Sequence, residues 1–205
     1  MSAVTATTDV EVCNLALDLV KEAPILNFEE NRFAARWMKR NFVPVVNMLM
    51  AKHVWKFAMT RAALPELSDA PAFEWRHQYR KPEDCLRVLP LREGGTLNGR
   101  LISHVVEGDL ILTNATGPLL VRYLAAKHNP AEWPAPFVEA ATTRLAAGIA
   151  NMMTGKQSLV EVLTVTHERA LAAAVSIDSA EGTHAEQYAT AYDDARYYYS
   201  LAEGY

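Results

Sequence analysis

Apolar residues recur every three or four positions near both ends of the chain, a spacing that is typical of amphipathic helices. The first predicted helix covers about residues 9–21, because its apolar residues fall on one helical face. Thr8 or Asp9 precedes this stretch and is expected to cap its N-terminus, and Pro24 marks its end. The chain is therefore expected to open with a short capped helix.

A second helix is expected to begin near Asn27. Glu30 follows three residues later, which is the spacing of a capping box. Pro44 falls within this predicted helix, and we expect it to kink the helix because proline removes a backbone donor and clashes with the carbonyl one turn earlier.

Two further helices are predicted in the C-terminal half. Trp133-Pro134 opens the third, because proline is accepted in a first turn, and Thr154-Gly155 ends it. The fourth is expected over about residues 158–177. The predicted apolar stripes are Phe137, Ala141, Leu145, Ile149 (or Gly148) and Met152 in the third helix, and Leu159, Leu163, Thr166, Ala170 and Ala174 in the fourth. Alanines in both helices favour close packing in a bundle.

The middle of the chain has a different pattern, with short apolar runs separated by turn residues. Five strands are predicted within 73–79, 85–91, 100–106, 109–113 and 118–125. The hairpin that joins Leu101–Val106 to Asp109–Thr113 across Gly108 has the clearest turn chemistry. These runs predict a small antiparallel sheet or sandwich.

The predicted fold is therefore α+β and mainly α: a four-helix bundle with an inserted antiparallel β section and a C-terminal arm. The expected parts are 1–54 and 130–181 for the two halves of the bundle, 55–129 for the β section and 182–205 for the arm. The C-terminal arm holds six of the eight tyrosines. Tyrosine buries a large area with few rotors, so we expect this arm to dock on a partner.

Charge and cysteine content narrow the function classes. The 205 residues include 20 Lys and Arg against 24 Asp and Glu, a formal net charge of −4, which argues against binding nucleic acid over the whole surface. Two cysteines, Cys13 and Cys85, cannot form a disulfide framework. The first twelve residues lack a secretion signal, and no apolar run approaches the ~20 residues of a membrane helix. We expect a protein made in a reducing cytoplasm.

The sequence motifs of common catalytic sites are each incomplete in this chain. Gly155-Lys156 lacks the rest of a phosphate-binding loop, since Gln157 replaces the magnesium-binding hydroxyl. His167-Glu168 lacks the second histidine of a zinc site, because Leu171 stands in its place. The six histidines are scattered singly. The sequence predicts no enzyme, no cofactor and no metal site.

The order of segments along the chain resembles the tail tubular protein A family of podophages, and the related head–tail adaptors of other tailed phages and of gene transfer agents. The resemblance covers about residues 9–180 and rests on segments in a fixed order. They are Cys13–Leu17, Trp55-Lys56-Phe57-Ala58, Arg61-Ala62, Trp75–Tyr79, Pro82–Leu89, Val121-Arg122-Tyr123 and Phe137 before an alanine-rich helix. Pro44 departs from the uninterrupted second helix that the family leads us to expect.

The resemblance implies structural work in a virion at the head–tail junction. Members form a ring, expected to be dodecameric, under the portal protein; the ring extends the DNA channel and offers a surface to the tail, stopper or nozzle proteins. DNA would pass through the lumen without sequence-specific binding, and no membrane is involved. We expect the C-terminal arm to dock on the portal, and a tail-side loop to contact the tail. The arm residues are Tyr188, Tyr192, Arg196, Tyr197, Tyr198, Tyr199 and Tyr205. The loop residues are Arg92, Gly94, Gly95, Asn98, Gly99 and Arg100, whose glycines are expected to supply flexibility.

Two alternatives remain open. One is a nucleic-acid-binding module that uses a basic strand face, formed by Arg76, His77, Arg80, Lys81 and Arg87. The other is a small enzyme with a pocket in the β section around His77, Asp84 and Arg122, for which the chain offers no motif.

Overall fold

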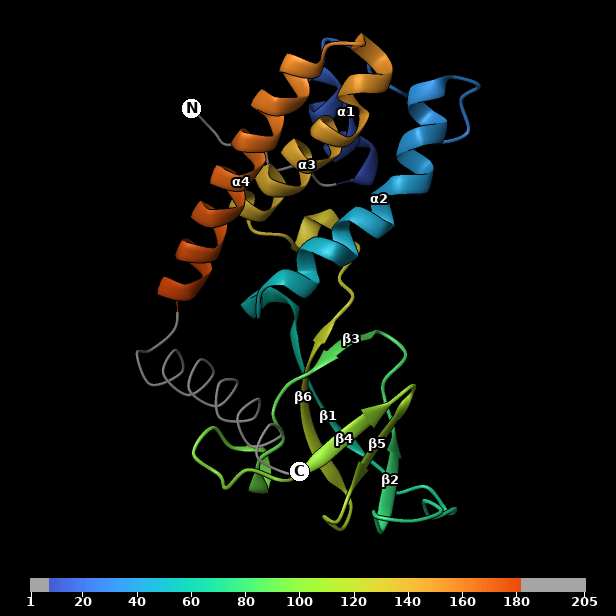
Figure 1. The fold of residues 1–205 in the computed structure, drawn as a ribbon, viewed down its shortest axis with the longest axis vertical. Helices are drawn as coiled ribbons and strands as arrows, with labels where there is room; N and C mark the ends of the chain where they lie inside the picture. Colours follow the sequence, from blue (N-terminus) through green and yellow to red (C-terminus); the bar gives the residue numbers. More distant parts are fainter. Residues whose placement is uncertain (1–7, 182–205) are drawn as a thin grey trace. The chain divides into compact units, whose positions relative to one another are not determined.

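The computed structural model describes residues 8–181, which form two compact units (Figure 1). The helical unit contains the described residues up to Phe57 together with Lys127–Asp178, and the β unit contains Ala58–Ala126. The class is α+β and mainly α, as predicted. The structure divides the chain at 57/58 and 126/127, where the sequence led us to expect a β section over 55–129.

Four helices build the helical unit: α1 (Asp9–Leu19), α2 (Phe33–Lys52), α3 (Ala135–Thr154) and α4 (Gln157–Ala180). Helix α3 is the central helix, and it packs against α1 and α2. It ends at Gly155, whose φ of 64° is the left-handed conformation of a glycine C-cap, as predicted.

An aromatic cluster fills the core of the helical unit around Phe137 on α3. The Phe137 ring lies edge-on to Trp55, Phe57 and Trp133, with centroids 4.9–5.1 Å apart. Phe42 on α2 stacks on Trp133 at 6.0 Å. Edge-to-face pairs of this kind add to the stabilisation from apolar burial alone. The rings therefore fix the segments on either side of the β unit to α2 and α3.

The N-termini of the first two helices differ in how well the sequence predicted them. Thr8 caps α1, which was one of the two expected residues, and it does so in a complete capping box with Glu11 that was not predicted. The second prediction was wrong, because α2 begins at Phe33 and not near Asn27. The Asn27 amide does donate to Glu30 Oε1 at 3.3 Å, but the bond closes a turn in the connector and no helix follows directly.

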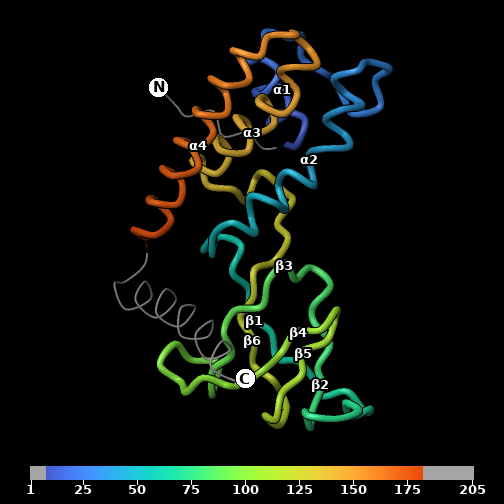
Figure 2. Tube along the Cα trace, in the orientation of Figure 1, coloured from blue at the N-terminus to red at the C-terminus, as the bar shows by residue number. Residues whose placement is uncertain are grey.

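Helix α2 continues through Pro44 without a break in its assignment. Figures 1 and 2 show the helix changing direction about midway along its length. A bend without interruption is the ordinary response to an internal proline, which removes one hydrogen bond of the helix.

Helix α4 buries three of the five residues predicted for its apolar stripe, Leu163, Ala170 and Ala174. Its buried residues are Leu163, His167, Ala170, Ala174 and Asp178. Thr166 is exposed, so the predicted stripe was wrong at that turn. Met152, predicted to be buried on α3, is also exposed. The prediction considered apolar spacing, so it did not include His167 and Asp178, two polar residues that are buried on α4.

The β unit has six described strands in two antiparallel three-stranded sheets. The strands are β1 (Met59–Leu64), β2 (His77–Arg80), β3 (Cys85–Val88), β4 (His104–Glu107), β5 (Leu110–Thr113) and β6 (Leu119–Ala125). One sheet has the order β1-β6-β3 and the other β2-β5-β4. The hairpin across Gly108 is confirmed, with a positive φ at that glycine. Strand β1 was missed, because its sequence, MTRAAL, has no marked alternation.

The two sheets share one apolar core. Leu119, Val121 and Tyr123 alternate along β6 on the inner face, where Tyr79, Leu91 and Ile111 meet them. The intervening residues of β6, Leu120 and Arg122, therefore lie on the outer face of its sheet.

Candidate interaction surfaces

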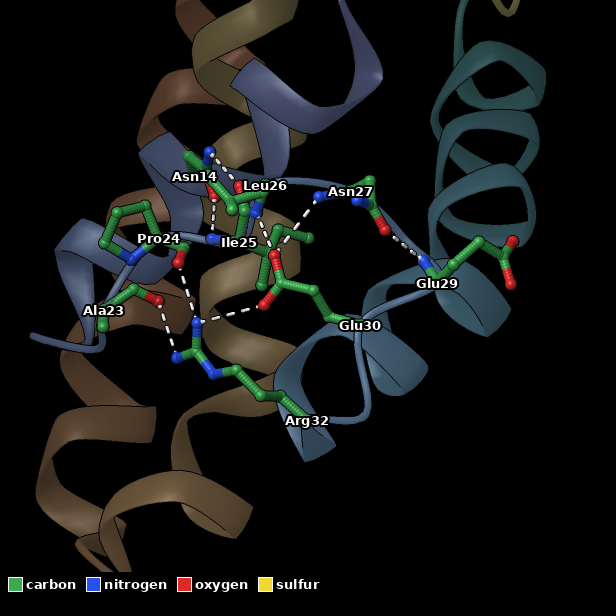
Figure 3. Close-up of polar contacts among 9 residues, drawn as sticks. All are labelled: Asn14, Ala23, Pro24, Ile25, Leu26, Asn27, Glu29, Glu30 and Arg32. Carbon is green, nitrogen blue, oxygen red and sulfur yellow. Dashed lines mark hydrogen bonds and ion pairs between the residues drawn. The ribbon is translucent and has the colours of Figure 1, made fainter.

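A connector of defined geometry joins α1 to α2 and presents exposed apolar side chains (Figure 3). The Asn14 side chain on α1 donates to the Ile25 carbonyl at 3.0 Å and accepts from the Ile25 amide at 2.8 Å. This amide pairs with the backbone as a neighbouring strand would. The Arg32 guanidinium donates to the carbonyls of Pro24 and Ala23 at 2.7 and 3.0 Å. Side chains from both ends, Asn14 of α1 and Arg32 just before α2, therefore hold the backbone of residues 23–25 in place.

Leu26 projects from this connector with 86% of its surface exposed, next to Ile25, which is buried. Its backbone amide donates to Glu30 Oε1. This bond, with the amide of Asn27 and the nearby Arg32, holds the pKa of Glu30 below its usual value. Phe33, at the start of α2, is also 40% exposed. A leucine held outward by a hydrogen-bonded backbone is preorganised for contact with another protein.

Helix α4 carries exposed apolar side chains on the side that faces away from its buried stripe. Val162 and Val165 are 61 and 45% exposed, and the exposed Ala172 and Ala173 follow along this side, which also carries the charged residues Glu161, Glu168 and Arg169. Small and branched apolar residues in this arrangement allow another helix to approach closely.

These two surfaces lie on different sides of one unit. Figures 1 and 2 show α4 on one side of α3, and α2, to which the α1–α2 connector leads, on the other side. An arrangement of two unlike apolar surfaces on opposite sides is what a head-to-tail contact between copies requires, because each copy then uses both.

Buried polar side chains attach α4 to the rest of the helical unit. Asp178, which is 5% exposed, accepts from the Lys56 backbone amide at 3.0 Å and pairs with His53 Nε2 at 2.9 Å. The Lys56 ammonium donates to the Asp178 carbonyl. The last turns of α4 are therefore held to the segment that follows α2, just before the C-terminal arm begins.

His167 makes a similar attachment two to three turns earlier. Its Nδ1 lies 3.1 Å from the Ala140 carbonyl of α3 and 3.5 Å from Thr143 Oγ1. Nε2 is buried and has no described hydrogen-bond partner. Burial lowers the pKa of this imidazole. The ring is therefore neutral near pH 7 and donates from Nδ1 to the carbonyl.

The tail-side loop, residues 92–100, is tied together by hydrogen bonds. The Arg92 guanidinium donates to the Gly99 carbonyl at 2.8 Å, and the Glu93 amide donates to the Arg100 carbonyl at 2.9 Å. Its glycines serve geometry, because Gly94 and Gly95 both have φ of 65° and a Cβ at Gly99 would lie 2.2 Å from the Glu93 oxygen. The backbone geometry of this loop therefore requires glycine at these positions. No hydrogen bond is described for the Asn98 side chain.

Two hollows flank this loop on the β unit. One, of about 360 Å³, lies between the loop and the turn that precedes β6; Arg92, Gly94, Thr116 and Leu120 are among its lining residues. The other, of about 310 Å³, lies over the outer face of β1 and β6 and is lined by Arg61, Arg122, Leu120 and the two loop glycines, among others.

The residues of the enzyme alternative do not share either hollow. His77 lies on β2, where its Nδ1 is 2.6 Å from Glu66. Asp84 accepts a 3.1 Å bond from the Tyr123 hydroxyl, and burial together with this contact raises the pKa of Tyr123 to about 12. Of the three residues in that alternative, only Arg122 lines one of these hollows.

The basic residues of the nucleic-acid alternative lie on two different sheets. Arg80 lies on β2, with Arg76 just before this strand and Lys81 just after it. Arg87 lies on β3 in the other sheet. Lys81 donates to the Gly108 carbonyl at 3.1 Å, so its ammonium already has a partner at the β4–β5 turn.

Several further predictions concern thiols, metals and membranes. Burial, with a contribution from Asp9, raises the pKa of Cys13 to about 12, and burial also raises the pKa of Cys85, so both are thiols at neutral pH.

Among residues 8–181, no three His, Cys, Asp or Glu side chains come together as metal ligands. No described helix combines the length and apolarity needed to cross a membrane. The portal-docking residues expected in the C-terminal arm, Tyr188 to Tyr205, lie outside the described part of the chain.

Comparison with protein-family models and with curated proteins finds no match for this chain.

Proposed function

We propose that this protein is a structural head-to-tail adaptor of a tailed phage or phage-like particle. In this proposal, copies of the chain form a ring under the portal protein in the virion, extend the DNA channel and offer a surface to tail or stopper proteins. The sequence resemblance suggested this function, and the ring would be dodecameric if the chain follows that pattern.

One structural observation carries the proposal: the helical unit has two unlike apolar surfaces on opposite sides. The α1–α2 connector presents Leu26 and Phe33, and α4 presents Val162 and Val165. Each surface has more than one exposed apolar side chain, whereas single scattered ones are ordinary on a protein surface. When the connector of one copy packs on α4 of the next, the contact is heterologous, and it closes into a ring if the rotation per subunit divides a full turn.

The β unit supplies the second contact region of the proposal. The tail-side loop is preorganised by its own hydrogen bonds, which lowers the entropy lost on binding a tail protein. The C-terminal arm supplies the contact with portal. The formal net charge of −4 is compatible with a channel through which DNA slides, because tight binding of DNA requires clustered basic residues.

Sedimentation of the purified full chain, alone and mixed with the candidate portal protein, tests the proposal. We expect joint sedimentation of the two proteins as a ring-sized complex. A chain that stays monomeric and ignores the portal would contradict the adaptor function. A chain ending at Ala180 that assembles on portal as tightly as the full chain would contradict the role of the C-terminal arm.

The interface between copies has its own pair of variants. Val162→Glu places a charge on the outward side of α4 and is expected to block ring formation on portal. Thr164→Glu is the matched control, because it adds the same charge to an exposed branched residue at the far edge of that exposed side. Equal assembly by both variants would exclude α4 from the interface.

A further inference from the structure

Two arginines lie directly opposite each other on the outer face of the β1-β6-β3 sheet. Arg61 of β1 pairs with Arg122 of β6 in the antiparallel register, and Arg87 of β3 is opposite Leu124 on the same face. Directly opposed side chains on neighbouring strands are close enough to interact, and like charges in this position repel. This face of the sheet therefore gathers positive charge from three different strands.

The hollow of about 310 Å³ lies at this pair. Its walls are the two arginines, the glycine turn of the tail-side loop and Leu120, which is 41% exposed. None of the described residues that line it is acidic. The surface that we call the arginine face, formed by Arg61, Arg87, Arg122 and Leu120, therefore combines positive charge with an apolar wall.

We propose that the arginine face binds the C-terminal arm of this same chain, residues 182–205. The arm has four carboxylate side chains and one arginine, together with six tyrosines, so its charge is opposite to that of the face. Tyr192-Asp193-Asp194 places an aromatic ring beside two carboxylates. Carboxylates pair with guanidinium groups through two parallel hydrogen bonds, and tyrosine rings pack on both arginine and leucine side chains.

This inference rests on the proposed function in one respect, the role of the arm on portal. A tyrosine that packs on the arginine face cannot contact the portal at the same time. Docking on the sheet would therefore shield the tyrosines involved in the free protein, and the portal has to displace them before the adaptor assembles.

Cleavage of the full chain by a small amount of chymotrypsin, which cuts after tyrosine, tests the docking in the absence of portal. We expect the double variant Arg61→Glu/Arg122→Glu to be cut within the arm about fivefold faster than the wild type, as losing two exposed ion pairs implies when cleavage follows the undocked population. The matched control is Arg76→Glu/Arg80→Glu, which makes the same charge change at exposed arginines of the other sheet region and should leave the rate unchanged.

Charge exchange provides the specific test. Asp193→Arg/Asp194→Arg should also speed cleavage, and combining it with Arg61→Glu/Arg122→Glu should restore slow cleavage. Arg61→Ala/Arg122→Ala replaces the glutamate variant if the latter fails to fold by circular dichroism. Equal cleavage of the wild type and the arginine variants, or equal acceleration by the control, would overturn the proposal.

Two further readouts separate this inference from other outcomes. If arm cleavage is unchanged while Arg61→Glu/Arg122→Glu abolishes salt-sensitive binding to duplex DNA, the arginine face is a DNA contact and the docking proposal is wrong. If the arm is protected as expected but the chain ignores portal, the docking stands and the adaptor function fails.

Discussion

Gly148 of α3 lies against the indole of Trp37 on α2, so closely that an added Cβ would be 2.9 Å from Cη2 and 3.1 Å from Cζ2 of the ring. Gly148 thus sets how closely these two helices approach. Glycine lowers helix propensity by up to about 1 kcal/mol relative to alanine, so its presence in the middle of α3 reflects packing.

We predict that Gly148→Ala lowers the free energy of unfolding by about 1–2 kcal/mol, because the cost of overpacking a rigid ring exceeds the gain in helix propensity. Urea unfolding of wild type and variant measures the difference. In a Trp37→Phe background the two close ring carbons are absent, so the same change should instead stabilise the protein. Destabilisation by Gly148→Ala in both backgrounds would show that the ring contact is not the cause.

We predict that Asp178→Ala destabilises the end of α4 by about 1–3 kcal/mol, because it leaves the Lys56 amide and His53 Nε2 without their buried carboxylate partner. Hydrogen exchange should rise in the last two turns of α4 and in residues 53–57. Ser176→Ala, at an exposed position of the same helix, is the control and should leave exchange unchanged. Unchanged exchange in Asp178→Ala would mean that the carboxylate does not hold the helix end.

We predict that Asn14→Ala loosens the α1–α2 connector, since it removes both hydrogen bonds to the Ile25 backbone. The expected loss of stability is about 1–3 kcal/mol, as for other part-buried groups left unpaired. If Leu26 acts in ring assembly, this variant should also assemble more weakly on portal while Leu26→Ala loses assembly without losing stability. Exchange at residues 24–27 that matches the wild type would contradict this role of Asn14.

We predict that acid weakens the attachment of α4 through His167. Burial lowers the pKa of the folded ring, with Arg144 and Lys52 acting in the same direction and the Ala140 carbonyl and Glu168 in the opposite one. The unfolded chain, with a histidine pKa of about 6.5, then binds more protons than the folded one, so stability falls as pH drops through about 6.5. His104, whose pKa is also lowered by burial, adds an effect of the same sign.

Unfolding midpoints measured between pH 8 and pH 5 check this prediction. His167→Leu should flatten the acid side of the profile, whereas Thr166→Leu, at the exposed neighbouring position, should keep the slope of the wild type. An identical slope in wild type and His167→Leu would show that this histidine does not titrate with folding.

Local sequence chemistry predicted several features well. The N-terminal cap of α1, the glycine that ends α3 and the hairpin across Gly108 each depend on a few neighbouring residues, so the local sequence located them, with Thr8 or Asp9 as the candidate caps. The same reasoning failed at Asn27, where the capping-box pattern closes a turn within a connector whose backbone at Ile25 is held by Asn14 of α1.

The candidate interaction surfaces also include some features that the sequence predicted and others that it did not. The composition of the arm and the glycines of the tail-side loop were visible in the sequence, but the arginine face was not. Arg61 and Arg122 are 61 residues apart and become neighbours only because β1 pairs with β6 in one register. No local signal marks such a pair, since β1 itself lacks a strand pattern.

By itself, the sequence of this protein determined the N-terminal cap of the first helix, the C-terminal end of the third, the hairpin across Gly108 and the α+β class, because backbone propensity and apolar spacing act over a few residues. Only the tertiary structure decided which polar side chains are buried, as at His167 and Asp178, and which surfaces are left uncovered, as at Leu26 and Val162. Burial is a property of contacts between distant segments, and the same histidine, aspartate or leucine is favourable inside or outside according to the partner that the fold brings to it.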